Sequence, residues 1–592
     1  MRPLLFLSFC LTLTGCDGTN YKKLFSEYIA KYPDYTGDKK TFIDDYKNNR
    51  LDLDIKFETF KGSKVETQKA HKGEKITITQ ESTLTNYSFA GWYKTESLEE
   101  EIQYSFVADT SVTFYAKFDP QCFSTFYVDG EVYQHLVIED DGKVVEPENP
   151  TKAGFKFDGW LDEEGEVFNF NTLISNKSIK LYAKFSYDFW DFPAIIINTD
   201  DGEDIVSKEE YKDSKVSILN TQNDYLMNEV VAGVRGRGNT SWTFGKKPYR
   251  IKFNKKQSVL GSSYKAKSWT LIANMSDKSL LRNYVAYELG ERFNGIEFSS
   301  KHELVDLYLN GEYKGVYLLC DQIQTGAGRV DINDSNETVE ADGNNGYFIE
   351  RDSRAPSEGV LNQDYFVFQD ETYAFKTPDT ESAEFISNKE VEIEYITEYM
   401  QSCWTAITDG DWSDVETLVD IDSFVDSYII DELFANNDCG QSSCFYYKKK
   451  NGKFYKGPVW DFDIGAGNIN YGMGNYDECL PNVTLHAALY NAFYEILYAR
   501  NEFKILVRNK LLSYENIIND VLESLDTESS TSLYGMYHNS LERNFDKWEI
   551  MGQGIWPEPQ TVVKTTTFKG QVDYLRTWLL ARFEYMTEVF AE

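Results

Sequence analysis

The 592-residue sequence has few histidines and no pair of cysteines at the spacing of a zinc site. None of its eight Cys forms a C-x-x-C pair and its five His show no metal-ligand spacing, so a structural zinc site is not expected. Basic residues are fewer than acidic ones: the chain has 60 Lys and Arg and 96 Asp and Glu, which gives a formal net charge of -36. A field of that sign repels nucleic acid and anionic lipid, so neither is expected as a general partner. Beyond the N-terminal segment no stretch is long and apolar enough to cross a membrane.

Aromatic residues, in contrast, are abundant. Phe, Trp and Tyr make up 15% of the chain, and 41% of all residues are hydrophobic. Such a chain has enough apolar surface to fold and is not disordered as a whole. At this length one hydrophobic core does not suffice, so we expect three or four domains.

The first residues carry a targeting signal. The stretch "MRPLLFLSFCLTLTGC" has one Arg, an apolar core about half as long as a membrane span, and a final Leu-Thr-Gly-Cys. Its end resembles the bacterial lipobox, which implies a signal peptide over 1–15 and lipidation of Cys16. An ordinary secretion signal with an incidental Cys is the alternative. Residues 16–52, polar with a short helix, are expected to be a spacer that tethers the protein to the extracytoplasmic face of a bacterial cell membrane.

Two copies of one small module follow. The Gly-Trp pairs at Gly91-Trp92 and Gly159-Trp160 are followed by two Tyr-Ala-Lys-Phe endings at nearly the same offset. Such self-similarity and the short alternating runs predict two small β-domains, over 53–119 and 120–186. They resemble the Listeria/Bacteroides repeat of bacterial surface proteins, which implies a stalk or adhesive spacer. We expect both Trp side chains to be core residues.

One stretch of the remaining chain is strongly basic. Between Arg235 and Ser276 there are ten Lys and Arg and no Asp or Glu. The segment "PYRIKF" within it alternates as a strand, with Tyr249, Ile251 and Phe253 on one face and Arg250 and Lys252 on the other. A solvated basic face and an anion-binding surface are equally compatible with this pattern.

A pair of carboxylates lies in "PVWDFDIGAG". If Val459 to Asp463 is a strand, Asp461 and Asp463 point to the same side and need a cation between them. Asn310-Gly311 and Asn451-Gly452 predict hairpins, "DKSLLRNYVAYELGERF" predicts a helix with Asp277 as its N-cap, and the last hundred residues are mostly helical in pattern.

Five segments in order resemble the CotH family of atypical, spore-coat-type protein kinases. They are "RGRGNTSW…KKPYRIKF", "WTLIANMSDKSLLRNYVAYELGERF", "LVDLYLNGEYKGVYLLCDQI", "ELFANNDCGQSSCFYYK" and "GPVWDFDIGAGN". The resemblance implies a multidomain chain in which the β repeat modules precede an α+β atypical protein-kinase-like domain over 187–592, with a mostly helical C-terminal part from about 483.

The resemblance also assigns roles to the acidic residues. Asp461 matches the metal-binding Asp of the family, and Asp438 matches the catalytic-loop Asp that orients or deprotonates the acceptor hydroxyl. Asp463, on the same side of the expected strand as Asp461, can supply further oxygens to Mg²⁺. Where ordinary kinases place an Asn for the second metal this chain has Ser443, a weaker ligand, for which Asn436 or Asn437 is a possible substitute.

The resemblance places the nucleotide on the basic side. Lys247 or Lys252 would hold the α- and β-phosphates, with Arg235 and Arg237 nearby; the K-K-x-Y pattern favours Lys247. The strand ending "YLLCDQI" resembles the hinge of a kinase and is expected to be an edge strand. Its backbone near Cys320, Asp321 and Gln322 would read adenine.

The expected function is therefore a surface-tethered protein kinase that transfers the γ-phosphoryl group of ATP to Ser or Thr of exported or surface proteins with Mg²⁺. The alternative is a catalytically silent, kinase-like adhesin or cell-envelope scaffold. Expected partners are a protein substrate, the membrane through the lipid anchor, and cell-wall or surface partners through the repeats. For Cys439 and Cys444 both a disulfide and free thiols are compatible with the sequence.

Overall fold

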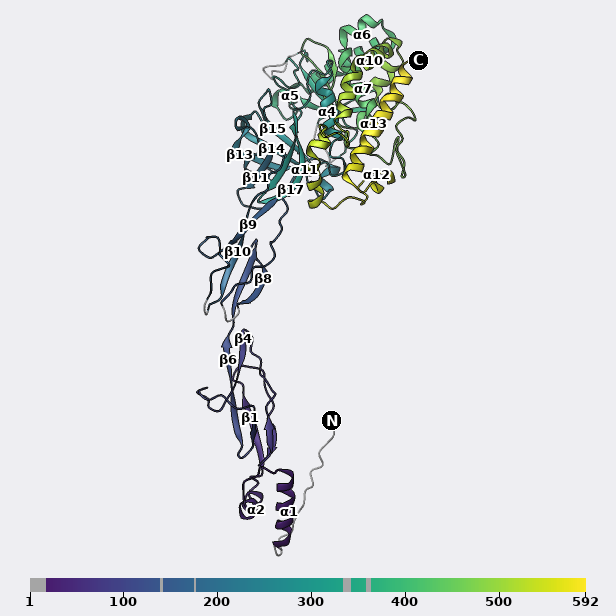
Figure 1. The fold of residues 1–592 in the computed structure, drawn as a ribbon. Coiled ribbons are helices and arrows are strands. Elements are labelled where there is room, and N and C mark those ends of the chain that lie inside the picture. The colour runs from purple at the N-terminus through teal and green to yellow at the C-terminus, as the bar shows by residue number, and fades with distance from the viewer. Residues whose placement is uncertain (1–17, 139–141, 175–176, 334–341, 358–363, 592) are drawn as a thin grey trace. The chain divides into compact units, whose positions relative to one another are not determined.

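The structure is a computed structural model that describes residues 18–138, 142–174, 177–333, 342–357 and 364–591 (Figure 1). The chain divides into two compact units. The first comprises Met1–Thr151 and Phe157–Ser186, and the second comprises Lys152–Lys156 and Tyr187–Glu592. None of the helices in the described ranges has the length and apolar character to span a membrane. The predicted lipidation site, Cys16, lies outside the described residues.

The first unit begins with two short helices where one was predicted. They are α1 (Gly18–Lys31) and α2 (Lys39–Lys47). The Asp38 side chain caps α2 by accepting the N–H of Thr41 at 2.8 Å. Aromatic rings pack between the helices around Tyr35 and Phe42, so this spacer has a small core of its own.

The two repeats fold as four-stranded sheets of the same strand order. The first sheet is ordered β2-β1-β6-β4 and the second β8-β7-β10-β9. Trp92 and Trp160 are fully buried in the two cores, which confirms their predicted role. The strands are β1 (Asp52–Glu58), β2 (Gln68–His71), β3 (Lys75–Thr77), β4 (Tyr87–Tyr93), β5 (Ser105–Val107), β6 (Val112–Pro120), β7 (Cys122–Val128), β8 (Glu131–Ile138), β9 (Phe155–Leu161) and β10 (Ile179–Tyr187).

The second unit opens with a closed seven-stranded barrel of order β11-β12-β13-β14-β15-β17-β16. Its strands are β11 (Ala194–Thr199), β12 (Lys212–Leu219), β13 (Met227–Gly236), β14 (Tyr249–Gln257), β15 (Ala266–Ile272), β16 (His302–Leu309) and β17 (Glu312–Asp321). The predicted alternation in β14 is confirmed, because Tyr249, Ile251 and Phe253 are buried in the barrel core while Lys252 is exposed. Two short helical turns, η1 (Asn223–Tyr225) and α3 (Thr240–Thr243), connect strands.

The hairpin predicted at Asn310-Gly311 joins β16 to β17. Both turn residues have positive φ, 49° at Asn310 and 74° at Gly311. This is the backbone that a two-residue type I′ turn requires, and Gly adopts it without strain.

A second, five-stranded sheet lies next in the chain, in the order β19-β20-β18-β21-β22. Its strands are β18 (Tyr347–Arg351), β19 (Tyr365–Phe368), β20 (Glu371–Thr377), β21 (Cys444–Lys448) and β22 (Phe454–Lys456). The turn between β21 and β22 contains Asn451 at φ 55°, so the second predicted hairpin is also confirmed.

The predicted helical C-terminal part is confirmed, but helices dominate already from residue 383 onward and not only from about 483. α7, α10 and α13 pack against one another (Figure 1). The helices of this unit are α4 (Arg282–Arg292), α5 (Ala383–Asp409), α6 (Trp412–Leu418), α7 (Ile421–Leu433), η2 (Asn437–Gly440), α8 (Ala487–Tyr490), α9 (Ala492–Tyr498), α10 (Asn501–Glu523), α11 (Leu533–Lys547), α12 (Gln560–Lys564) and α13 (Phe568–Ala591). One large core joins these helices to the second sheet.

The helix predicted from Asp277 begins later, at Arg282, so the prediction of Asp277 as its N-cap is wrong. The Asp277 carboxylate nevertheless accepts the N–H groups of Ser279 at 3.0 Å and Arg282 at 2.9 Å. It therefore stabilises a tight turn that precedes the helix.

Candidate active site

A cavity of about 1740 Å³ opens in the second unit. The barrel side contributes Arg237, Arg250 and Gln322 to its lining, and the second sheet contributes Glu350 and Lys376. The remaining lining comes largely from loops, among them those that carry the predicted acidic residues. We call this cavity the cleft.

Four predicted residues come together in the cleft: Asp438, Ser443, Asp461 and Asp463 all line it. The hydroxyl of Ser443 donates to Oδ2 of Asp461 at 3.1 Å. The hydroxyl of Ser276, which sequence reasoning did not single out, donates to Oδ2 of Asp463 at 3.0 Å. The result is a wall of oxygen atoms, which we call the acidic wall, in which the carboxylates of Asp461 and Asp463 are each paired with a hydroxyl.

The strand expected over Val459 to Asp463 is not formed. No regular secondary structure covers this segment, and Asp461 has the positive φ of 67°. The two carboxylates line one cleft because the chain turns here, and strand alternation is not the cause. The segment leaves the sheet after β22 and bends around the buried ring of Phe462, which packs against Phe434.

The first two residues of α4 hold this acidic segment in place. Asn283 accepts the N–H of Phe462 at 2.7 Å. The guanidinium of Arg282 donates to the carbonyls of Gly465 at 3.0 Å and Ala466 at 3.2 Å. Arg282 is itself fully buried and paired with Asp277 at 2.5 Å. Buried hydrogen bonds of this kind fix the backbone next to the two carboxylates.

Burial and mutual repulsion perturb the acidic residues. Burial, followed by the charge of Asp461, raises the pKa of Asp438 to about 7, and the nearby guanidinium of Arg354 opposes the shift. The same two causes, burial first, raise the pKa of Asp463 well above its usual range. Like charges held close in a partly dry cleft favour either a proton or a cation. A divalent cation is the ligand that this arrangement suits best.

Hydrogen bonds from side chains outside the cleft lining hold the loop that carries Asp438. The Asn436 side chain accepts the N–H of Asp438 at 3.1 Å and donates to the buried carboxylate of Asp431 at 2.9 Å. Tyr494 donates to the other oxygen of Asp431 at 3.0 Å. Through these contacts the Asn436 side chain positions Asp438. Asn437, the other residue considered as a substitute for Ser443, is buried and does not line the cleft.

Two arginines, Arg237 and Arg250, and one lysine, Lys256, line the cleft from the barrel side. Arg237 lies over the ring of Trp460 at 5.7 Å, and Arg250 donates to the Ser268 hydroxyl at 3.3 Å. Sequence reasoning placed Arg250 on the polar face of its strand but gave it no role. Its place within the acid-free stretch, 13 residues after Arg237, is the signal that could have identified it.

The other predicted phosphate-binding residues lie outside the cleft lining. The ammonium of Lys247 donates to the Trp242 carbonyl at 2.6 Å. Lys252 is exposed, and its ammonium lies 5.6 Å from the centre of the Tyr211 ring. Arg235 lies over the same ring at 4.9 Å and donates to the carbonyl of Lys208. The structure therefore does not bring these three cations together with the carboxylates.

The hinge-like segment differs from its prediction in two respects. β17 pairs with β15 on one side and β16 on the other, so it is not an edge strand. Gln322 lines the cleft, whereas Cys320 and Asp321 do not. The Arg329 guanidinium donates to both carboxylate oxygens of Asp321, from Nε at 2.6 Å and from Nη2 at 2.8 Å. β17 is not an edge strand because the barrel is closed, so that both of its edges are paired.

The cysteines within the described residues are free thiols, Cys439 and Cys444 among them. Both are buried, and both contact Asn491, whose amide donates to the Cys439 carbonyl at 2.7 Å and to Sγ of Cys444 at 3.4 Å. They act as packing residues behind the loop that carries Asp438.

Comparison with known families agrees with the two resemblances drawn from the motifs. Residues 234–586, more than half of the chain, match the family model described as CotH kinase protein. Residues 54–117 and 125–184 each match the Listeria-Bacteroides repeat domain. The order of the two families along the chain is the predicted one.

Three relatives share shorter stretches with the chain. A "Putative membrane protein" of Evansella cellulosilytica is 29% identical over 170 residues, 28% of this chain and 26% of the relative. A "Putative Gly-rich membrane protein" of the same organism is 29% identical over 143 residues, 23% of this chain and 16% of the relative. Internalin H of Listeria monocytogenes is 32% identical over 110 residues, 18% of this chain and 20% of the relative. The chain thus matches about a quarter or less of the length of each.

Proposed function

The chain belongs to the CotH kinase protein family, and from this premise we propose that it is a Mg²⁺-dependent protein kinase. In this proposal the γ-phosphoryl group of ATP passes to a Ser or Thr hydroxyl of a protein acceptor. The observation that carries the proposal is the convergence of Asp438, Asp461 and Asp463 on one cleft that Arg237 and Arg250 also line. Phosphoryl transfer needs bound phosphates, neutralised charge and an oriented hydroxyl, and these residue types supply each of them.

The acidic wall fits Mg²⁺ by its donor chemistry. Carboxylates and hydroxyls are oxygen donors of the kind that Mg²⁺ prefers, and no His or Cys is among the residues that line the cleft. Asp461 and Asp463 would hold the ion, with Ser443 as a further oxygen. When bound, Mg²⁺ neutralises phosphate charge. The hydroxyls of Ser276 and Ser443 keep one oxygen of each carboxylate in a fixed direction.

Asp438 would accept the proton, or a hydrogen bond, from the acceptor hydroxyl. Its pKa of about 7 leaves it in exchange between both protonation states at neutral pH, which suits a general base. The hydrogen bond from its own N–H to Asn436 holds the loop in the orientation that exposes the carboxylate to the cleft.

Phosphate oxygens would be held by Arg237 and Arg250. Both carry planar guanidinium groups that pair with phosphate in a bidentate manner. The roles of Arg235, Lys247 and Lys252 stay predictions, and each would need its side chain to leave the contact described above. Gln322 is the one residue of the hinge-like segment that we place beside the nucleotide, because it lines the cleft.

The expected place of action is the outer face of a membrane. Two relatives carry the words "membrane protein" in their names, and the N-terminal sequence up to Cys16 has the pattern of a lipidated export signal. The two repeats would then act as a spacer between the anchor and the kinase-like unit or bind cell-wall partners. The acceptor would be an exported or surface protein.

A kinase-like scaffold without turnover is the second candidate. The observation in its favour is that backbone groups of the hinge-like segment are already used: the N–H of Asp321 binds Lys301, and the N–H of Gln322 binds Ser268. The carbonyl of Gln322 also accepts from Arg329. These backbone groups are then not free to read adenine, so a cleft that binds a partner without ATP is consistent with the contacts.

The two candidates separate in one experiment. The chain from Asp17 onward would be incubated with labelled ATP and Mg²⁺ and examined by mass spectrometry, beside Asp438→Asn and Asp461→Asn. Glu384→Gln is a matched control, because this exposed carboxylate lines the same cleft away from the acidic wall. Phosphoryl transfer to Ser or Thr that both Asn variants abolish and the control retains is the expected result. No transfer, together with no Mg²⁺-dependent shift in melting temperature on addition of ATP, would favour the scaffold.

A further inference from the structure

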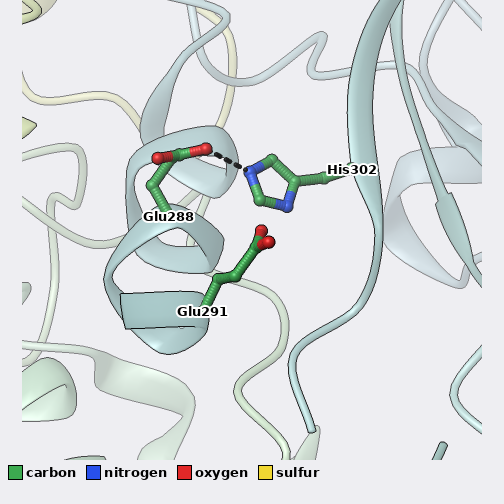
Figure 2. Close-up of side chains that lie close together, drawn as sticks. All are labelled: Glu288, Glu291 and His302. Atoms are coloured by element: carbon green, nitrogen blue, oxygen red, sulfur yellow. Dashed lines mark hydrogen bonds and ion pairs between the residues drawn. The ribbon is translucent and has the colours of Figure 1, made fainter. Parts of the chain in front are cut away.

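A second group of possible metal ligands lies outside the cleft. Glu288 and Glu291 are three residues apart on α4 and therefore on the same face of the helix. His302 is the first residue of β16. Figure 2 shows both carboxylates reaching from the helix toward the imidazole ring. One oxygen or nitrogen from each residue lies within 4.8 Å of the others.

The buried imidazole is oriented as a metal ligand would be. Nδ1 of His302 lies 3.0 Å from the carbonyl of Ser300. A carbonyl only accepts, so Nδ1 carries a proton, and in the neutral ring the lone pair of Nε2 then faces the carboxylates. Such a carbonyl contact at the second ring nitrogen is the common support of a metal-bound histidine. The rings of Tyr284 and Tyr287 flank the imidazole, with centroids 5.0 and 5.8 Å away, and shield it from water.

The spacing of His302 and Glu288 fits a single ion. Nε2 of His302 is 3.1 Å from Oε1 of Glu288. Two donors that each bind one cation at about 2.0–2.1 Å, at angles of about 90–110°, are separated by about 2.9–3.4 Å. Arg292 occupies the other oxygen of Glu288 at 2.7 Å, which leaves Oε1 turned toward the ring.

An ion pair of protonated His302 with Glu288 is the competing explanation, and it has no use for Glu291. Within the described part of the chain the Glu291 carboxylate makes no hydrogen bond or ion pair. It stands exposed beside a buried imidazole that already has a carboxylate next to it. A metal ion would use this third donor, whereas the simple pair would leave it in solvent.

We propose that Glu288, Glu291 and His302 bind one Zn²⁺ ion, with solvent in the fourth position. One imidazole with two carboxylates suits Zn²⁺, whereas Mg²⁺ and Ca²⁺ favour sites made of oxygen alone. The sequence indicated no zinc site because its ligands are not spaced as in Cys- or His-rich motifs, and His302 follows Glu291 only after a loop. The inference does not depend on kinase activity.

A Zn²⁺ ion here would connect the end of α4 to the start of β16. The other end of α4 carries Arg282 and Asn283, which hold the segment of Asp461 and Asp463. Binding would therefore stiffen the helix that braces the cleft, and the folded protein would gain stability that grows as RT ln(1 + [Zn²⁺]/Kd).

Zinc binding would be measured by competition with a chromophoric chelator, and Co²⁺ absorption would serve as a second readout. The full chain would carry Asp461→Asn and Asp463→Asn, so that the cleft does not contribute. We expect one Zn²⁺ per chain and a higher melting temperature with zinc. Glu291→Gln should weaken Zn²⁺ binding at least tenfold without changing the melting temperature of the metal-free protein, because this side chain is exposed. His302→Asn should remove the imidazole-dependent Co²⁺ bands.

Glu303→Gln is the matched control, since Glu303 adjoins His302 in the chain and pairs with Lys301 instead. It should keep full affinity. An absence of saturable 1:1 binding, or unchanged affinity in Glu291→Gln, would overturn the proposal and leave an ion pair. If His302→Asn fails to fold, Glu291→Gln decides alone.

Discussion

Lys278 and Glu558 form an ion pair whose loss should destabilise the protein in a pH-dependent way. Their side chains are fully buried, and the ammonium lies 2.6 Å from Oε2 of Glu558. Lys278 also donates to the carbonyl of Gln553 at 2.6 Å, and Glu558 accepts the N–H of Ile555 at 2.9 Å. Lys278 lies in the turn that also carries Ser276, so the pair supports the wall of the cleft.

Lys278→Met keeps the length of the side chain and removes its charge. The carboxylate of Glu558 is then buried without a counter-charge, which typically costs about 3–5 kcal/mol. It can avoid that cost by binding a proton. From an ordinary Glu pKa near 4.3, protonation at pH 7 costs about 3.7 kcal/mol, and at pH 5 about 1 kcal/mol. The lost hydrogen bond to Gln553 adds about 1 kcal/mol.

The expected loss of unfolding free energy is therefore about 4–5 kcal/mol at pH 7 and about 2 kcal/mol at pH 5. Burial already raises the pKa of Glu558 in the wild type, against the lowering effect of Lys278, so removal of Lys278 raises it further. Stability of the variant relative to wild type should fall as pH rises. Urea unfolding followed by Trp fluorescence at both pH values measures this difference.

The double variant Lys278→Met/Glu558→Gln is the control, because it removes both charges. Its stability should lie within about 2 kcal/mol of wild type and should not depend on pH in this way. A loss below 1 kcal/mol at pH 7 in the single variant, or the same loss at pH 5 and pH 7, would refute the reasoning that an uncompensated carboxylate causes the effect.

Three further predictions follow from the cleft and the barrel. Arg237→Gln should weaken ATP binding about tenfold or more, whereas Lys252→Gln, at an exposed side chain, should change it less than twofold. Titration calorimetry measures both affinities, and the reverse order would contradict the assignment of Arg237 to the phosphates. Asp438→Asn should abolish phosphoryl transfer and raise the melting temperature at pH 8. Because folding raises the pKa of the Asp438 carboxyl to about 7, this carboxyl makes the folded protein progressively less stable as the pH rises from about 4 to about 7. A gain in melting temperature that does not shrink toward pH 4 would show another cause. Gly311→Ala should cost about 1–2 kcal/mol in urea unfolding, since φ at this turn is 74°, and an unchanged midpoint would argue against the type I′ turn.

Local patterns predicted the elements well. Alternation identified the buried face of β14, Asn-Gly pairs identified the turns of two hairpins, and the repeated Gly-Trp pairs identified two β modules with a Trp core. These features depend on residues close together in the chain. Five ordered motifs were enough to indicate the family.

The prediction was less accurate where distant segments meet. Which cations face the carboxylates depends on closure of the barrel, and closure places Arg237 and Arg250 in the cleft lining but not Lys247. The start of α4 depends on the turn around Asp277. The shape of the acidic segment depends on Asn283, which is 179 residues away from Phe462 in the chain. Neither spacing nor alternation carries such information.

The backbone of Asp461 decides how its role has to be tested. Its φ of 67° lies in the left-handed region, where Asn and Asp are tolerated better than other residues with a Cβ and where most side chains cost about 1–2 kcal/mol. The neighbouring contacts of Phe462 hold this conformation in place. Asp461→Ala would therefore combine backbone strain with the loss of a carboxylate. Asp461→Asn keeps the size of the side chain and the conformational tolerance and removes only the charge, so a loss of Mg²⁺-dependent ATP binding in that variant reports on the carboxylate itself.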